Sequence, residues 1–192
     1  MGAGVTPVQE RQETTGSQEE PLASPIRIVP ENINPTMSTL TLSKTIAAVR
    51  IATAVFFILF GQYKLFGPGF AHGGFQEHLR GYMEGGAVSF YRPILAKLVL
   101  PHAVFLGYAV GAVEMFIGVS LLLGMWVRVA SVLGVLHMLS LALATWWEPG
   151  HGVPVWRYFG AELDHLPLLF LFVIFFVSDA GRQWGLDRRL RQ

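Results

Sequence analysis

The sequence predicts an all-α integral membrane protein: a four-helix bundle with an amphipathic helical cap between the first and second spans. Hydrophobic residues make up 52% of the chain and charged residues only 14%, and the mean hydropathy is +0.46. A soluble domain normally carries about a quarter charged residues. The 192 residues leave room for four spans of about 20 residues each, once an N-terminal tail and one long loop are set aside.

The composition also excludes several classes of function. The chain has no cysteine, which removes disulfide exchange, thiolate nucleophiles and cysteine-ligated zinc or iron–sulfur clusters. The net charge is +1 and the pI is near 8.1, and no basic run with interleaved aromatic residues is present. We therefore expect no metal site and no nucleic-acid partner.

Two regions differ sharply in composition. Residues 1–40 are rich in Pro, Gln, Glu, Ser and Thr and show no periodic apolar pattern. Such a segment is typical of a disordered tail, or of one that becomes ordered on a partner. Residues 41–192 hold the apolar stretches, and we expect them to form the membrane domain.

The first span is expected over residues 42–66, with Ser43 as its N-cap and a Gly-Pro-Gly stop immediately after it. Residues 70–100 are too polar to cross a membrane. Their spacing predicts two short amphipathic helices, broken at Gly85 and Gly86, that lie at the interface as a cap over the bundle. The remaining three spans are expected over residues 101–124, 128–147 and 161–178.

The distribution of Lys and Arg near the span ends predicts the topology. The side that holds both termini has a modest excess of these residues. We therefore expect both termini in the cytoplasm, with the cap and the loop of residues 148–160 on the outer side.

Glu114 is a carboxylate near the middle of the second span, where an ionisable group is costly and needs a partner. At 100° per residue it shares a stripe with three glycines, which let helices approach closely. The stripe consists of Gly107, Gly111, Glu114 and Gly118. We expect Glu114 to pair with Arg50 of the first span, with Arg128 nearby. The pair either fixes helix register or serves as a proton relay.

Two further sets of polar residues are candidates for binding. Lys64, His102, Asp164 and His165 are expected near the outer surface, where a His/Asp pair beside apolar helices would suit a quinone carbonyl. The alternative is that they are ordinary polar groups at span ends. His137, in the middle of the third span, either makes an interhelical hydrogen bond or ligates a haem or pigment, and the hydrogen bond is favoured.

Several of these residues also form a family pattern. The first span contains Arg50, Phe57, Gly61 and Lys64, and the second span and its turn contain Glu114, Gly118, Leu121, Gly124 and Arg128. A motif with Gly181, Arg182, Leu186 and Asp187 follows the last span. Over residues 42–187 the chain resembles the DoxX/DoxD family of small four-helix membrane proteins, which includes the membrane subunit of thiosulfate:quinone oxidoreductase.

The resemblance implies a membrane subunit of an oxidoreductase or electron-transfer complex, in the inner (cytoplasmic) membrane of a bacterium or archaeon. Its expected partners are other membrane or membrane-associated subunits and lipid, and its expected ligand is a quinone. No redox cofactor ligands are evident in the chain itself, so any enzymatic role is at most that of the quinone-side subunit. The alternative is a purely structural accessory subunit of a respiratory or photosynthetic assembly.

Overall fold

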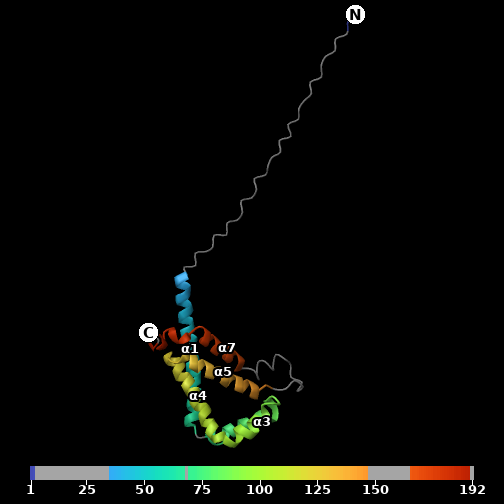
Figure 1. The fold of residues 1–192 in the computed structure, drawn as a ribbon, viewed down its shortest axis with the longest axis vertical. Helices are drawn as coiled ribbons and strands as arrows, with labels where there is room; N and C mark the ends of the chain where they lie inside the picture. Colours follow the sequence, from blue (N-terminus) through green and yellow to red (C-terminus); the bar gives the residue numbers. More distant parts are fainter. Residues whose placement is uncertain (3–34, 68, 147–164, 191–192) are drawn as a thin grey trace. The chain divides into compact units, whose positions relative to one another are not determined.

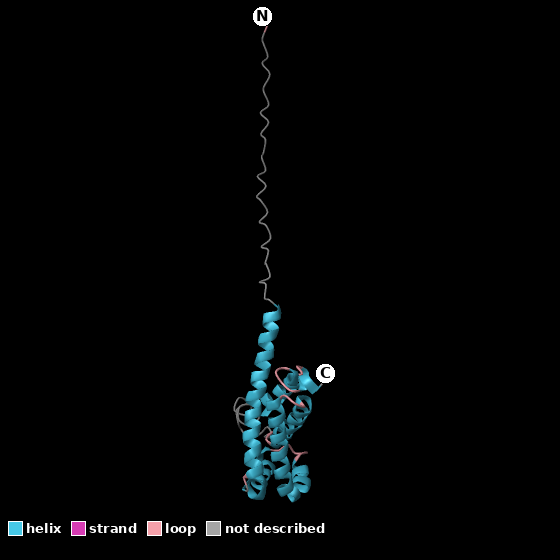
Figure 2. Cartoon of the chain, turned by 90° about the vertical axis from the view of Figure 1, so that its left-hand side faces the viewer, coloured by secondary structure: helices cyan, strands magenta, loops and turns pink. Residues whose placement is uncertain are grey.

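The computed structural model describes residues 1–2, 35–67, 69–146 and 165–190. From Pro35 onward the described residues form helices joined by short loops, with no strand among them (Figures 1 and 2). Within these ranges, three helical stretches are long and apolar enough to cross a membrane: Thr39–Phe66, Arg92–Leu123 and Val127–Ala144. A shorter apolar helix covers His165–Val177. The predicted all-α membrane class is confirmed.

Helix α1 covers Pro35–Phe66 and ends where the Gly-Pro-Gly stop was predicted. It starts earlier than residue 42, so the prediction of Ser43 as N-cap is wrong, because Ser43 lies inside the helix. Proline suits a first helical position, and the residues between Pro35 and Ser43 include no glycine or further proline. Figure 2 shows these extra N-terminal turns extending beyond the other helices. Most of the predicted disordered tail, residues 3–34, lies outside the described residues.

The cap begins after α1 with one almost continuous helical run that ends at the predicted glycine break. It consists of η1 (Phe70–Gly74), which is kinked at His72 and Gly73, α2 (Phe75–Gly81) and the π-helical η2 (Tyr82–Gly86). Leu79 is buried in a small core with Ala87, Leu95 and Ala103. The backbone N–H of Val88 donates to the carbonyl of Leu143, so the cap is attached to the end of the third long helix.

The second predicted cap helix is not separate from the second span, and that expectation is wrong. A single helical stretch, Arg92–Leu123, replaces both. Pro101 indicates a helix start in the sequence because proline has no backbone N–H to donate, which is tolerated in the first turn of a helix but not in its interior. The helix accommodates it by changing its winding before the regular α-helix begins. The segments are α3 (Arg92–Ile94), the π-helical η3 (Leu95–Val99), the 3₁₀ turn η4 (Leu100–His102) and α4 (Ala103–Leu123).

Helices α1 and α4 are antiparallel neighbours, as expected for spans one and two, and glycines bring their backbones close together. A Cβ atom on Gly111 would lie 2.9 Å from Cβ of Lys64 and 3.1 Å from the backbone nitrogen of Leu65. A Cβ atom on Gly118 would lie 2.8 Å from the backbone nitrogen of Ile58. Gly111 and Gly118 of the predicted glycine stripe therefore lie on the surface against which α1 packs, whereas Gly107 packs against Ala71 in the cap.

Substitution of Gly118 with alanine is expected to lower the melting temperature in detergent, because the added methyl group meets the backbone of α1. The expected loss is about 1–3 kcal/mol, the usual cost of overpacking a close contact. Gly81→Ala is the matched control, since a Cβ atom there meets nothing within 4 Å. Equal melting temperatures for the two variants would contradict the close approach of α1 and α4.

Helices α5 (Val127–Ala144) and α7 (His165–Val177) complete the bundle. Phe172 is fully buried, lies against Gly134 and meets the ring of Phe57 edge to face at 5.2 Å between ring centroids. Phe175 is also buried, whereas Ile174 is exposed. One face of α7 thus belongs to the core. The predicted start of this span, residues 161–164, lies outside the described residues.

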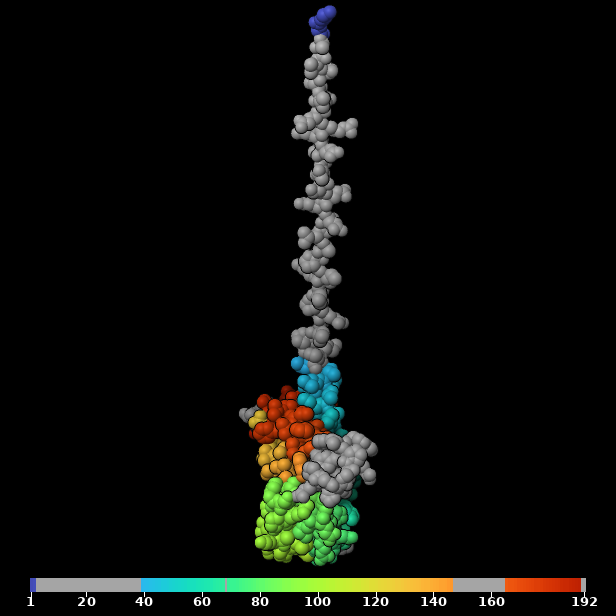
Figure 3. All heavy atoms as spheres, turned by 90° about the vertical axis from the view of Figure 1, so that its right-hand side faces the viewer, coloured from blue at the N-terminus to red at the C-terminus, as the bar shows by residue number. Residues whose placement is uncertain are grey.

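The chain continues after α7 into η5 (Ala180–Arg182) and α8 (Asp187–Leu190). This C-terminal segment and the cap lie at opposite ends of the bundle (Figures 1 and 3). The start of α1 is at the same end as the C-terminal segment (Figure 1). Which end faces the cytoplasm stays a prediction.

Candidate functional site

Glu114 is the centre of a polar triad inside the bundle. Its Oε1 atom accepts hydrogen bonds from Nζ of Lys64 on α1, at 2.5 Å, and from Nε2 of His137 on α5, at 2.9 Å. The side chain of Glu114 is 5% exposed, that of His137 11% and that of Lys64 19%. The interhelical hydrogen bond favoured for His137 is confirmed. The triad joins three helices through one carboxylate oxygen.

The predicted pair between Glu114 and Arg50 is wrong, and the register of α1 against α4 is the reason. Gly111 lies beside Lys64, whereas Gly124 lies beside the guanidinium of Arg50. Ten residues separate Glu114 from Gly124, which is about 15 Å along a helix. Arg50 is therefore too far along the helix axis to reach the carboxylate.

Arg50 instead holds the C-terminal segment. It is completely buried, and its guanidinium donates to the carbonyl oxygens of Ala180, at 2.9 Å, and Trp184, at 3.4 Å. Asp187 attracts the same guanidinium electrostatically. Gly124, in the left-handed conformation with φ of 64°, leaves the space that the guanidinium occupies.

Asp187 also caps helix α5 from a distant part of the sequence. Its two carboxylate oxygens accept from the backbone N–H groups of Trp126, at 2.8 Å, and Val127, at 3.1 Å. These groups stand at the start of α5, where helical N–H groups lack partners and the helix dipole favours a negative charge. Gly181 packs directly against this carboxylate, so a larger residue would displace it.

The other motif residues lie at the same end. Nε of Arg128 lies 3.3 Å from Oδ1 of Asp179, and Nη1 of Arg182 lies 3.8 Å from Oδ2 of Asp179. The backbone N–H of Leu186 donates to the carbonyl of Leu123. Arg128 is thus far from Glu114, contrary to the expectation. The motif after α7 closes one end of the bundle.

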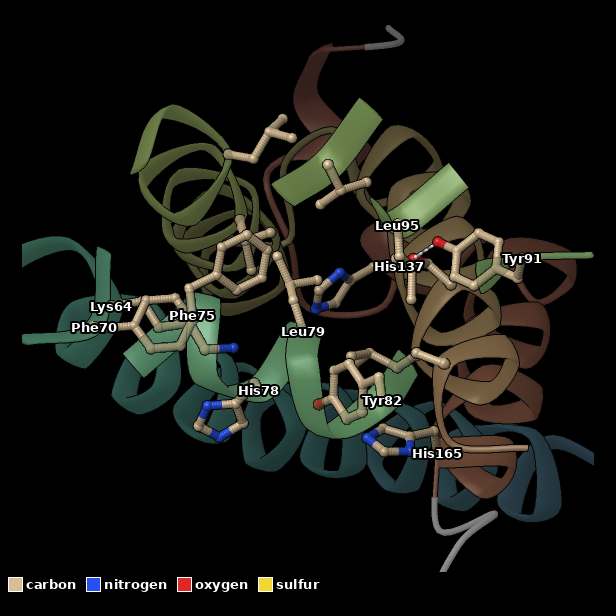
Figure 4. Close-up of a pocket in the computed structure, with 16 residues that line it drawn as sticks. Lys64, Phe70, Phe75, His78, Leu79, Tyr82, Tyr91, Leu95, His137 and His165 are labelled. Carbon is tan, nitrogen blue, oxygen red and sulfur yellow. Dashed lines mark hydrogen bonds between the residues drawn. The ribbon is translucent and has the colours of Figure 1, made fainter. Parts of the chain in front are cut away.

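A cavity of about 370 Å³ lies between the triad and the cap, and we name it the cap cavity. Figure 4 shows His137 pointing into the middle of the surrounding side chains. Its walls are mainly aromatic and aliphatic, including Phe70, Phe75, Leu79, Leu95, Leu106 and Val110. Its polar groups come from Lys64, His78, Tyr82, Tyr91, His137, Ser140 and His165. The hydroxyl groups of Tyr91 and Ser140 are hydrogen-bonded at 2.7 Å.

A second cavity of about 410 Å³ shares Lys64, Leu141 and His165 with the first, and we name it the lateral cavity. Its other lining residues come from α1, α4, α5 and α7 and are apolar except for Glu114: Phe56, Phe57, Phe60, Glu114, Met138 and Leu168. Glu114 is absent from the lining of the cap cavity, and His137 from that of the lateral cavity. The triad therefore borders both cavities.

The four residues predicted to bind quinone have different positions. Lys64 and His165 line both cavities, so the structure brings these two together. His102 is exposed where the 3₁₀ turn meets α4 and lines neither cavity. Asp164 lies outside the described residues.

Sequence reasoning missed two features of the site. The Lys64–Glu114 ion pair follows from the glycine register, which could have been found by pairing the small residues of α1 and α4 before pairing the charges. The contribution of Tyr91 carried no sequence signal, because this residue follows the cap break and reaches Ser140 only through tertiary packing.

The helices, their apolar outer surfaces and the internal triad define a multi-pass α-helical membrane protein. The DoxX family model matches residues 45–147, and the chain belongs to the DoxX family. No curated protein and no solved structure matches the chain.

Proposed function

We propose that this DoxX protein is the membrane subunit of an oxidoreductase or electron-transfer complex and that it binds a quinone in the cap cavity. The observation that carries the proposal is the combination of apolar, largely aromatic walls with hydrogen-bond donors on one cavity. Ligand sites for small molecules typically have this composition and volumes of about 300–1,000 Å³. The family's frequent association with oxidoreductases supports the same assignment.

The donors in the cap cavity suit a quinone because quinone carbonyl oxygens only accept hydrogen bonds. Lys64 uses one N–H on Glu114 and has others to offer a ligand. His137 donates through Nε2 to Glu114, so it holds the carboxylate in place rather than supplying a donor to the ligand. Tyr91 offers a hydroxyl group. Phe70 and Phe75, whose ring centroids are 5.6 Å apart, provide a surface for a flat ring.

A bound quinone would accept two electrons from a redox-active partner subunit and two protons, and would leave as quinol. The residues of this chain would hold the ring, position its carbonyl groups and keep the site dry. Glu114 would keep Lys64 and His137 in place through its Oε1 atom. This arrangement makes the triad a positioning group for the cap cavity.

The purified protein in phosphatidylcholine nanodiscs is expected to bind decylubiquinone, and Leu106→Trp is expected to weaken that binding at least about tenfold. The larger side chain would fill the cavity, because Leu106 lines it. Titration calorimetry measures the affinity. Leu122→Trp is the matched control on the same helix, since Leu122 is exposed and lies outside the cavity.

Two results would contradict this function. Wild-type protein that binds no decylubiquinone would favour the structural alternative, in which the chain only attaches other subunits. Equal affinities for wild type and Leu106→Trp would show that quinone binds elsewhere.

A further inference from the structure

We propose that the lateral cavity is a second ligand site and that it takes the reduced molecule, a quinol, through a hydrogen bond to Oε2 of Glu114. The proposal rests on the proposed function for the identity of the ligand. It rests on the lateral cavity itself for the position of the site and for the chemistry that the site selects.

The first observation is a buried acceptor without a donor. Oε1 of Glu114 receives the hydrogen bonds from Lys64 and His137. No hydrogen-bond partner faces Oε2 among the described residues, although the side chain is 95% buried. A buried polar atom without a partner is costly, and most such atoms in folded proteins are satisfied. A ligand with an O–H group would satisfy Oε2.

The second observation is the shape and lining of the cavity around Glu114. A volume of about 410 Å³ is within the range of small-molecule sites. Three phenylalanines of α1 line one wall, and aliphatic and thioether side chains of α5 and α7 line the others. These walls suit a flat ring with an apolar tail. The residues are Phe56, Phe57, Phe60, Met138, Leu141 and Leu168.

The two cavities share the donor Lys64 but differ in their other hydrogen-bonding groups. The hydroxyl group of Tyr91 lines only the cap cavity, whereas the carboxylate of Glu114, with its unpartnered Oε2 atom, lines only the lateral cavity. A quinone has only acceptors, while a quinol has two hydroxyl donors. A hydrogen bond from a hydroxyl to a carboxylate is also among the stronger kinds. The carboxylate acceptor of the lateral cavity thus favours the reduced form there, because a quinone has no hydroxyl group to donate.

A lipid headgroup with hydroxyl groups offers the same donor chemistry. The aromatic wall favours a ring over a glycerol headgroup, which is why we assign the site to quinol. Nanodiscs separate the two sources. Phosphatidylcholine has no hydroxyl donor in its headgroup, whereas phosphatidylglycerol has two.

The test measures decylubiquinol and decylubiquinone affinities by titration calorimetry under anaerobic conditions in phosphatidylcholine nanodiscs. Leu168→Trp, which fills the lateral cavity, is expected to weaken quinol binding at least about tenfold and to leave quinone binding unchanged. Leu106→Trp is expected to do the reverse. Ile174→Trp, at an exposed position on the same helix as Leu168, is expected to change neither affinity.

Glu114→Gln tests the acceptor directly. The amide must direct its oxygen to Lys64 and His137, so it presents an N–H group to the lateral cavity. Quinol affinity is expected to fall at least about tenfold, the usual loss for a hydrogen bond to a charged group. If this variant does not fold, Leu168→Trp decides the question.

Other results of these titrations would decide between the two proposals. Equal quinol affinities for wild type and Leu168→Trp would overturn the lateral site. Loss of quinol binding in Leu106→Trp instead of Leu168→Trp would also overturn it. A site that phosphatidylglycerol occupies and quinol does not would overturn the quinol assignment. Quinol binding that depends on Leu168 in a protein that binds no quinone would uphold the lateral site and refute the proposed function.

Discussion

Replacement of Asp187 with alanine is expected to lower the free energy of unfolding by about 3–5 kcal/mol, the usual cost of removing one partner of a buried charged network. Three groups lose their partner at once. The N–H groups of Trp126 and Val127 lose their acceptor, and the buried guanidinium of Arg50 loses its nearby negative charge. Thermal and denaturant unfolding in detergent measure the loss.

Two further variants make this result specific. Asp187→Asn keeps one carbonyl acceptor but removes the charge, so it is expected to lie between wild type and Asp187→Ala. Arg188→Ala is the neighbouring control, because Arg188 is exposed and should change stability by no more than about 0.5 kcal/mol. Equal stabilities for Asp187→Ala and Arg188→Ala would show that the C-terminal segment does not cap α5.

A double-mutant cycle between Lys64 and Glu114 is expected to give a coupling energy of about 1–3 kcal/mol. The substitutions are Lys64→Met and Glu114→Gln. Each single variant leaves its former partner in a nearly buried position without its opposite charge, whereas the double variant leaves no unmatched charge between the two positions. The unfolding free energy of the double variant should therefore fall by less than the sum of the two single-variant decreases, as measured by unfolding in detergent.

The same cycle with Arg50→Gln and Glu114→Gln is the control. Residues with no shared partner and a separation of more than about 10 Å have additive effects within about 0.5 kcal/mol. Additivity for Arg50 and Glu114, together with coupling for Lys64 and Glu114, would match the observed register. Coupling between Arg50 and Glu114 would instead support the pairing that the sequence alone suggests.

The helical class and the close packing of the first two long helices could be predicted from the sequence, because hydropathy and glycine spacing report them directly. The continuous helical stretch that begins at Arg92 could not be predicted from the sequence. Pro101 is a strong local signal for a helix start, but tertiary packing allows the helix to pass through it with altered winding. The start of α1 at Pro35 was missed because the polar composition of residues 35–41 resembles that of the preceding tail.

The candidate site could be predicted in part. Lys64 and His165 were placed near a shared pocket, and both line it. Glu114 was recognised as a residue in need of a partner, but the choice between Lys64 and Arg50 depends on a shift of a few turns between two helices. Apolar periodicity does not determine such a shift. Here the glycine contacts determine it, and they place Arg50 at the opposite end.

The capping of α5 by Asp187 has a consequence for biogenesis. The chain is synthesised from its N-terminus, and Asp187 lies 60 residues beyond the N–H group of Val127 that it satisfies. Helices α1, α4 and α5 therefore leave the ribosome before the group that joins Arg50 to the turn between α4 and α5. Until that group arrives, the N–H groups of Trp126 and Val127 and the guanidinium of Arg50 lack the C-terminal partners that they have in the folded chain. The contacts that close this end of the bundle can thus form only after the segment that follows α7 has been synthesised.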